Sequence, residues 1–360
     1  MNQINIDDLV RNNIKDLKPY SSARSEYKGE ASVFLDANEN AYGSPAFLSS
    51  SPGEGPGERL NRYPDPLQWQ LKEELSKIKG VPPQNIFIGN GSDEVIDIAF
   101  RIFCEPAKDN VIICPPTYGM YKVCAAINNV AVKEVLLTPE FQLNVEGILS
   151  AVDENTKLLF ICSPNNPTGN NLNRIDIETL LNNFPGIVVI DEAYINFSRQ
   201  KPFIQELTEY ENLIVMQTLS KAWGLAALRL GLGFASEKII DLFNKVKPPY
   251  NINLASQQLG LQALLKVDEV NRNIRNIVEQ RRKVQQQLQQ FDFIKKIYPS
   301  DSNFILIKAD DADKLYQYLL TYKIIVRNRN KEPLCENCIR ITIGTETENI
   351  TLINALKNYE

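Results

Sequence analysis

The middle of the chain alternates short apolar runs with segments long enough to form helices. The runs occupy positions 86–88, 111–114, 132–135, 158–162, 187–190, 213–217 and 230–235. Short runs without a polar face are typical of strands buried on both sides, and their alternation with helices predicts βαβ units around a mostly parallel sheet. We therefore expect an α/β fold with a seven-stranded sheet and right-handed crossovers.

The pattern changes after Pro248 and Pro249, which interrupt the alternation. One long helix is predicted there, at about 255–290. Beyond it the chain predicts a strand at 303–308, a helix at 310–322, strands at 324–327 and 339–343, and a helix after Thr345. Such a mixture of strands and helices indicates a smaller α+β unit.

The length of the chain favours two domains. It has 360 residues, whereas single hydrophobic cores usually stop growing at about 250–300 residues. We expect a large α/β domain at 48–250 and a small α+β domain at 251–360. Residues 1–47 are expected to form an N-terminal arm and part of the small domain, so that both termini contribute to it.

Composition and charge narrow the class of protein. Hydrophobic residues make up 43%, charged residues 23%, and the net charge is −5, which indicates a soluble protein without a nucleic-acid partner. The N-terminus lacks the basic and apolar regions of a signal peptide. The most apolar stretch, 222–235, contains Arg229 and is too short to span a bilayer. We expect a cytoplasmic metabolic protein.

Histidine is absent, and this restricts the possible chemistry. The sequence has no histidine and six cysteines, which excludes Ser-His-Asp triads and histidine metal sites. Cys335 and Cys338 form a C-x-x-C pair, but a zinc site needs about four ligands and there is no second pair. We expect no metal, and chemistry carried by Lys, Tyr, Asp, Asn and Arg with a cofactor.

Lys221 follows a predicted strand and precedes an apolar, glycine-containing segment. A lysine there would be partly desolvated, which lowers its pKa and makes it a better nucleophile toward an aldehyde. Arg229, eight residues later, could reach a phosphate as a charge-assisted donor. The motif alone is weak, because most lysines are solvated surface charges.

Asp191 ends the predicted strand at 187–190 and is followed closely by Tyr194. Ligands of open α/β sheets bind at the carboxyl ends of the strands. An aspartate at that edge could keep a pyridinium nitrogen protonated, and Tyr194 could bond the phenolic oxygen of the same ring. The alternative for Asp191 is a helix N-cap.

Two further motifs also follow predicted strands. In the segment 162–169, Asn-Pro and Thr-Gly pairs enforce a tight turn that would fix the Asn166 amide. Ser92 and Asp93 open a predicted helix after Gly91, and backbone N–H groups at a helix start bind phosphate. Both are also ordinary N-cap residues. Together, four strand ends at one sheet edge supply the parts of a pyridoxal phosphate site.

These motifs resemble those of the fold-type I pyridoxal-phosphate aminotransferases and, more narrowly, of the histidinol-phosphate aminotransferase family. The resemblance runs from LKPYSSAR at 17–24 to IRITIGT at 339–345. The segments between are LDANEN at 35–40, NRYPDP at 61–66, GNGSDE at 89–94, PPTYGMY at 115–121, CSPNNPTG at 162–169, VIDEAY at 189–194 and TLSKAWGLAALRLG at 218–231.

The resemblance implies roles at the cofactor. Lys221 would bond pyridoxal 5′-phosphate and move a proton, and Asp191 would pair with the pyridine nitrogen. Asn166 and Tyr194 would contact the ring oxygen O3′, while Tyr118 would stack on the ring. The phosphate would be held by Ser92, Asp93, Thr218, Ser220 and Arg229.

The resemblance also implies a partner and a substrate site. Tyr63 would reach the cofactor phosphate of a neighbouring subunit, which implies a homodimer with shared sites. Arg327 and Arg340 would bind the anionic groups of the substrate, with Tyr20 and Asn166 beside them. An arginine fork suits both phosphate and carboxylate, although exposed arginines that make ordinary surface pairs are the alternative.

The activity implied is transamination of L-histidinol phosphate with 2-oxoglutarate, which belongs to histidine biosynthesis. Two enzyme alternatives stay open: a decarboxylase of phosphorylated amino acids with the same fold, and an aromatic or broad-range aminotransferase. A non-catalytic regulator that binds the cofactor is a third alternative. It would need a DNA-binding module, for which a chain already used by the enzyme fold leaves no room.

Overall fold

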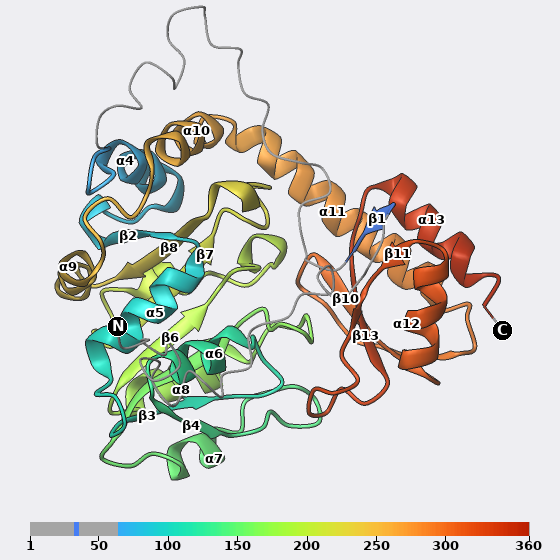
Figure 1. Cartoon of the computed structure of the whole chain (residues 1–360), viewed down its shortest axis with the longest axis horizontal. Coiled ribbons are helices and arrows are strands. Elements are labelled where there is room, and N and C mark those ends of the chain that lie inside the picture. The colour runs from blue at the N-terminus through green and yellow to red at the C-terminus, as the bar shows by residue number, and fades with distance from the viewer. Residues whose placement is uncertain (1–31, 36–63, 360) are drawn as a thin grey trace, which may run out of the picture.

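The structure is a computed structural model that describes residues 32–35 and 64–359 (Figure 1). A large sheet with helices around it occupies one side of the molecule, and a smaller sheet with its own helices occupies the other (Figure 1). Helix α11 (Val267–Leu288) runs from the first group of elements to the second (Figure 1).

The large sheet has seven strands in the order β2-β8-β7-β6-β5-β3-β4. Their bounds are β2 Ile86–Asn90, β3 Asn110–Ile113, β4 Ala131–Glu134, β5 Thr156–Cys162, β6 Ile187–Asp191, β7 Leu213–Thr218 and β8 Leu230–Ala235. Strand β8 runs antiparallel to β2 and β7, and the other neighbouring pairs are parallel. The expected seven-stranded, mostly parallel α/β sheet is therefore confirmed.

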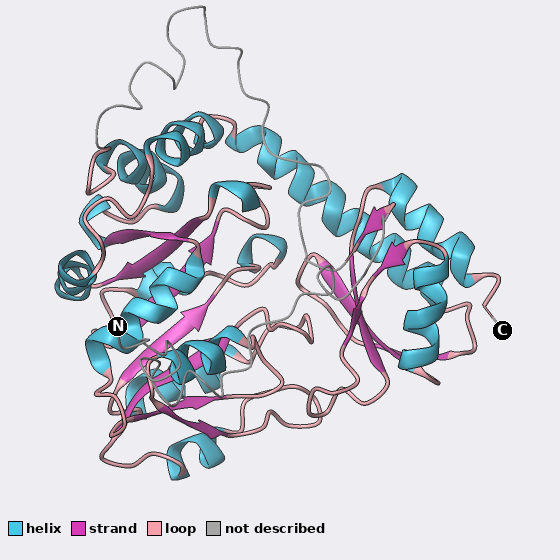
Figure 2. Cartoon of the chain, in the orientation of Figure 1, coloured by secondary structure: helices cyan, strands magenta, loops and turns pink. Residues whose placement is uncertain are grey.

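Helices cover both faces of this sheet, as the arrangement in Figure 2 shows. The helices α5 (Ser92–Phe103), α6 (Met120–Ile127) and α9 (Glu237–Val246) bury apolar side chains on one face. On the other face lie α4 (Trp69–Lys79), α7 (Val145–Ser150), α8 (Arg174–Asn183) and α10 (Leu254–Leu264). Burial on both faces explains why the central strands are continuously apolar.

The alternation of side chains along β6 decides which face each polar residue meets. Val189 packs in the cluster of α5 and α6, whereas Ile190 packs in the cluster of the opposite face. Because strand side chains alternate, Asp191 faces the α5 and α6 side and Glu192 the other.

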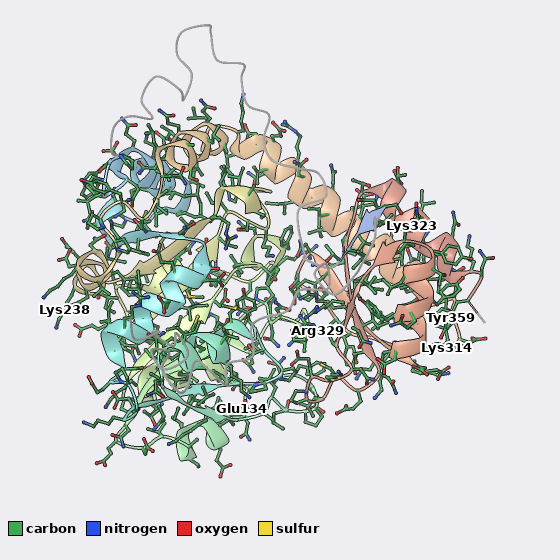
Figure 3. The ribbon with its side chains drawn as sticks, viewed as in Figure 1. Glu134, Lys238, Lys314, Lys323, Arg329 and Tyr359 are labelled. Carbon is green, nitrogen blue, oxygen red and sulfur yellow. The ribbon has the colours of Figure 1, made fainter. Side chains whose placement is uncertain are left out.

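Exposed charged side chains such as Lys238 project from the outer edge of the molecule (Figure 3).

The smaller sheet is antiparallel, with the order β12-β13-β10-β9. Its strands are β9 Ile294–Ile297, β10 Phe304–Ala309, β12 Arg327–Asn328 and β13 Cys338–Thr342. Helices α12 (Ala312–Thr321), α13 (Glu346–Leu356) and part of α11 accompany it. The short strand β1 (Val33–Phe34) pairs with β11 (Ile324–Ile325), which places an N-terminal segment beside the C-terminal part.

The single helix expected at about 255–290 is wrong. Two helices, α10 and α11, are separated by Leu265 and Lys266. The N–H of Lys266 bonds the carbonyl of Ala263, a tight turn that ends α10. The chain must turn here because α10 packs beside α4, while α11 continues to the smaller sheet.

No helix in the described part of the chain is both long and apolar enough to cross a membrane.

Candidate active site

The candidate site lies at the edge of the large sheet where the parallel strands end. Strand β6 ends with Asp191, the loop after β5 carries Asn166, and the loop after β7 carries Lys221. Helix α5 begins directly after β2. All four segments follow strands that point the same way, so their polar residues meet at one edge, as the sequence predicts.

Asp191 is a buried carboxylate, only 4% exposed. Its Oδ2 accepts a hydrogen bond from the Tyr121 hydroxyl at 2.6 Å, and its Oδ1 accepts the Ala193 N–H at 3.0 Å. Burial raises the pKa of Asp191 to about 6, and these hydrogen bonds oppose the rise. The helix-cap interpretation is wrong, because the next helical turn, η3 (Ile195–Phe197), has Tyr194 at its N-cap position.

Asn166 connects the two sheets. Its Nδ2 donates to the Tyr194 hydroxyl at 3.4 Å, and its Oδ1 accepts from Arg340 Nη1 at 2.5 Å. Tyr194 and Arg340 both pack against the ring of Phe304 on β10. These residues, which the sequence predicts separately, thus form one buried cluster.

The Lys221 ammonium lies 6.0 Å from the ring centre of Tyr194 and attracts the charge of Asp191. Lys221 is only partly buried, while Ala222 and Trp223 after it are buried and anchor the loop. The Ser220 N–H donates to Thr218 Oγ1 at 3.0 Å, which fixes the turn before the lysine. The amine is therefore held at the strand-end edge by residues on both sides of it.

The start of α5 forms a cradle. Gly91 is its N-cap, at φ 81°, and its N–H donates to the carbonyl of Arg229 at 2.7 Å. A Cβ at Gly91 would collide with the Arg229 guanidinium, which would have to shift, and the positive φ of Gly91 itself favours glycine. Arg229 itself has φ 53°, a left-handed conformation that is uncommon outside glycine. Ser92 and Asp93 belong to the first turn, so the interpretation of these two residues as N-caps is wrong.

Side chains beside this cradle interact with one another. Asp93 Oδ2 lies 3.5 Å from Arg229 Nη2, and its Oδ1 accepts a hydrogen bond of 3.1 Å from the Tyr118 hydroxyl. Tyr118 packs edge-on against Tyr121, with ring centres 5.6 Å apart. Tyr118 and Arg229 therefore lie on the same side as Asp93, around the helix start.

The two arginines expected to bind substrate are cross-strand neighbours. Arg327 on β12 is directly opposite Arg340 on β13. Both guanidinium groups are donors of the kind that suits a phosphate or a carboxylate. Arg340 is 4% exposed and Arg327 is half-buried, so the pair has one deep and one accessible member.

Tyr20 and Tyr63 lie outside the described residues, as does most of LDANEN. Cys335 and Cys338 are both buried free thiols. Across 32–35 and 64–359, no group of three or more metal-ligating side chains that could hold a metal ion is found.

Residues 32–356 match the family model described as aminotransferase class I and II. The chain belongs to this family. It is 54% identical, over 99% of both chains, to a protein of Bacteroides thetaiotaomicron named histidinol-phosphate aminotransferase.

Solved aminotransferase structures share the fold. Histidinol-phosphate aminotransferase from Sinorhizobium meliloti matches with a TM-score of 0.85 at 23% identity, covering 96% of each chain. A decarboxylase from Sulfurospirillum multivorans matches with a TM-score of 0.79 at 23% identity, covering 98% of each. Because both activities occur on this fold, the fold does not decide between them.

The site of this aminotransferase fits pyridoxal phosphate. Three features of the group need different partners: a phosphate, a pyridine nitrogen and an aldehyde. The cradle at Gly91 offers backbone N–H groups and an arginine, Asp191 is a buried acid, and Lys221 is an amine whose charge acts on Asp191. Each partner has the chemistry that one feature of the group requires.

The sequence patterns do not identify Tyr121 as a site residue, although it lies in the motif PPTYGMY. Its spacing of three residues from Tyr118 is the only signal that could have indicated it. Which buried group its hydroxyl would meet depends on how α6 packs over β5 and β6.

Proposed function

We propose that this protein transfers the amino group of L-histidinol phosphate to 2-oxoglutarate, giving imidazole-acetol phosphate and L-glutamate. The observation that carries the proposal is the 54% identity, over 99% of each chain, to a protein named histidinol-phosphate aminotransferase. The cofactor is pyridoxal 5′-phosphate, in agreement with the family and with the residues of the site.

In this proposal a different set of residues binds each part of the cofactor. The start of α5 at Ser92 and Asp93, with Thr218, Ser220 and Arg229, holds the phosphate; backbone N–H groups at a helix start suit an anion. Asp191 faces the pyridine nitrogen, and Tyr118 covers one side of the ring. Asn166 and Tyr194, which bond each other at 3.4 Å, both face the ring oxygen.

When bound, the cofactor supplies an aldehyde that takes up the amino group and a ring that withdraws electrons from the substrate. Lys221 Nζ would carry a proton between the α-carbon of the substrate and the cofactor. Tyr194 and Asn166 orient the ring oxygen during the transfer.

Arg327 and Arg340 bind the anionic end of both substrates. The proposal uses one pair for two ligands, because the arginine fork accepts phosphate and carboxylate alike. The hydrogen bond from Arg340 to Asn166 positions this pair against the cofactor site. Tyr20 would complete the substrate pocket from the N-terminal arm.

Three features of organisation belong to the proposal. The protein would act as a homodimer in which Tyr63 reaches the neighbouring subunit's cofactor phosphate. Residues 48–250 would form the cofactor domain, with 251–360 and the N-terminal arm forming the small one. The enzyme would work in the cytoplasm, because its charged, phosphorylated substrates do not cross a bilayer without help.

The test is a half-reaction on purified protein, followed by the visible absorbance of the bound cofactor. L-Glutamate and L-histidinol phosphate are added separately, without a second substrate. We expect each to convert the cofactor to its amino form, and Lys221→Ala to abolish both conversions.

The alternatives predict other results. A decarboxylase would release carbon dioxide from a phosphorylated amino acid and would not convert with glutamate. A broad-range aminotransferase would convert with phenylalanine or tyrosine as readily as with histidinol phosphate. Conversion by neither substrate, in protein that still binds the cofactor, would contradict the proposed substrate pair.

A further inference from the structure

Tyr121 lies in the first turn of α6 and is fully buried. Its ring stacks on Phe160 of β5, with ring centres 4.8 Å apart and an interplanar angle of 16°. It also meets the edge of Tyr118. Full burial together with these two ring contacts restricts the ring, so the hydroxyl has a fixed direction.

That direction is toward Asp191. The hydroxyl donates to Asp191 Oδ2 at 2.6 Å, a short distance typical of a charge-assisted O–H···O⁻ bond. The other oxygen, Oδ1, accepts the Ala193 N–H at 3.0 Å. With each oxygen held by one donor, the carboxylate plane is set, and each oxygen keeps further acceptor capacity for a ligand.

We propose that Tyr121 is a positioning residue, whose hydroxyl orients the Asp191 carboxylate and keeps it charged for the pyridine nitrogen of the cofactor. The proposal rests on the proposed function, because it assigns Asp191 to that nitrogen. Tyr121 acts through Asp191 and touches neither substrate nor cofactor in this role.

The charges around Asp191 explain why such a donor is needed. Burial and the nearby charge of Asp93 raise the pKa of Asp191, while the Tyr121 hydrogen bond and Lys221 lower it, leaving it at about 6. Cys162, its neighbour on β5, is a buried thiol whose pKa is also raised, chiefly by burial, so it stays neutral. Without the Tyr121 hydroxyl, the carboxyl would be protonated at a higher pH.

Tyr121 remains a donor under these conditions. Burial, followed by the charge of Asp191, raises the pKa of its hydroxyl well above the ordinary value. The hydroxyl is therefore protonated wherever Asp191 is ionised. A residue that only filled space would not need this hydroxyl, since phenylalanine has the same ring.

The first experiment uses the protein without cofactor. Aspartate labelled with ¹³C at the carboxyl carbon is titrated by NMR in the wild type and in Tyr121→Phe, and Asp191→Asn assigns the signal. We expect Tyr121→Phe to bind the Asp191 proton about tenfold more tightly, because a hydrogen bond to the charged form is lost. Phenylalanine keeps the stacking on Phe160, so the variant should fold.

Tyr318→Phe is the matched control. It removes a hydroxyl that donates to the carbonyl of Ala355 at 2.9 Å, among helices α12 and α13. It should leave the Asp191 titration unchanged. An Asp191 titration that is equal in Tyr121→Phe and in the wild type overturns the proposal.

The second experiment adds pyridoxal phosphate labelled with ¹⁵N in its ring. The nitrogen shift should indicate a protonated ring in the wild type and a smaller protonated fraction in Tyr121→Phe at pH 8. We expect kcat to fall by about tenfold with little change in KM, because the substrate arginines are untouched. Equal ring protonation in both proteins overturns the proposal.

The two proposals fail separately in these experiments. Absence of cofactor binding by the wild type contradicts the proposed function, whatever the aspartate titration shows. Normal binding and transamination by the wild type, with no difference in Tyr121→Phe, contradicts the positioning role alone.

Discussion

Arg340 donates a hydrogen bond of 2.5 Å to the side-chain carbonyl of Asn166, a residue 174 positions earlier in the chain. The arginine belongs to the smaller sheet and the asparagine to the loop after β5 of the large one. Asn166 in turn bonds the Tyr194 hydroxyl. The anion-binding end of the proposed site is thereby held at a defined position relative to the cofactor end.

Replacing Arg340 with lysine should weaken the binding of both substrates. Lysine keeps the charge but cannot bond Asn166 and an anion at the same time through a planar fork. We expect KM for glutamate and for histidinol phosphate to rise about tenfold or more, the loss of one charge-assisted hydrogen bond. Steady-state kinetics measure both values.

The control for Arg340→Lys is Arg101→Lys, on the exposed side of α5, where the arginine pairs with Asp97. That variant should have wild-type kinetics. Cofactor affinity should be unchanged in both proteins. An unchanged KM for both substrates in Arg340→Lys would show that this arginine does not bind them.

Anions should stabilise the protein through the cross-strand pair of Arg327 and Arg340. The register places the two arginines opposite each other, and phosphate that binds the folded protein at this pair stabilises it by mass action. We expect the Tm of the wild type to rise in phosphate above its value in sodium chloride of equal ionic strength. Arg327→Gln should lose most of this difference, and equal phosphate effects in the two proteins would refute the idea.

Gly91→Ala should weaken cofactor binding. The new methyl group must displace the Arg229 guanidinium, which is proposed to hold the phosphate. We expect affinity for pyridoxal phosphate to fall about tenfold, the cost of one charge-assisted contact. Fluorescence titration of the protein without cofactor gives the dissociation constant.

Gly80→Ala separates backbone strain from this displacement. Gly80 also has a positive φ, 69°, but a Cβ there would meet nothing within 4 Å. Both variants should lose some stability, since alanine resists this conformation. Only Gly91→Ala should lose cofactor affinity, and equal losses in both would argue against the cradle.

Glu192 should make stability depend on pH. This carboxyl faces away from Asp191, accepts the Phe203 N–H at 2.7 Å and the Gln217 amide at 2.9 Å, and is almost fully buried. Burial raises its pKa from 4.5 to about 7. A raised pKa means that its contribution to stability is present below pH 4.5 and lost as pH rises through 7.

Glu192→Gln should remove this part of the pH dependence. Urea unfolding of the protein without cofactor at pH 5 and pH 8 should show a smaller change in the variant, by roughly 3 kcal/mol or less. The change due to Asp191 is common to both proteins and cancels in the comparison. Glu178→Gln on α8 is the control, and identical profiles for Glu192→Gln and the wild type would contradict the prediction.

The pattern of apolar and polar residues was sufficient to predict features that depend on residues close together in the chain. Each expected strand of the large sheet is present, because continuous apolar runs can be buried only between layers of helices. Asp191, Asn166 and Lys221 lie at the edge of the sheet as predicted, because each follows such a run. The strands β1 and β9 were not expected, since β1 has two residues and β9 reads Ile-Lys-Lys-Ile, without alternation.

The sequence by itself determined the class of fold and the edge of the sheet at which the predicted residues Asp191, Asn166 and Lys221 lie. Only the tertiary structure decided which residues meet: Tyr121 with Asp191, Arg340 with Asn166, and Arg327 with Arg340. It also decided that the chain turns between α10 and α11. The physical reason is that a pattern along the chain specifies which side chains are buried, whereas their partners depend on how distant elements pack together.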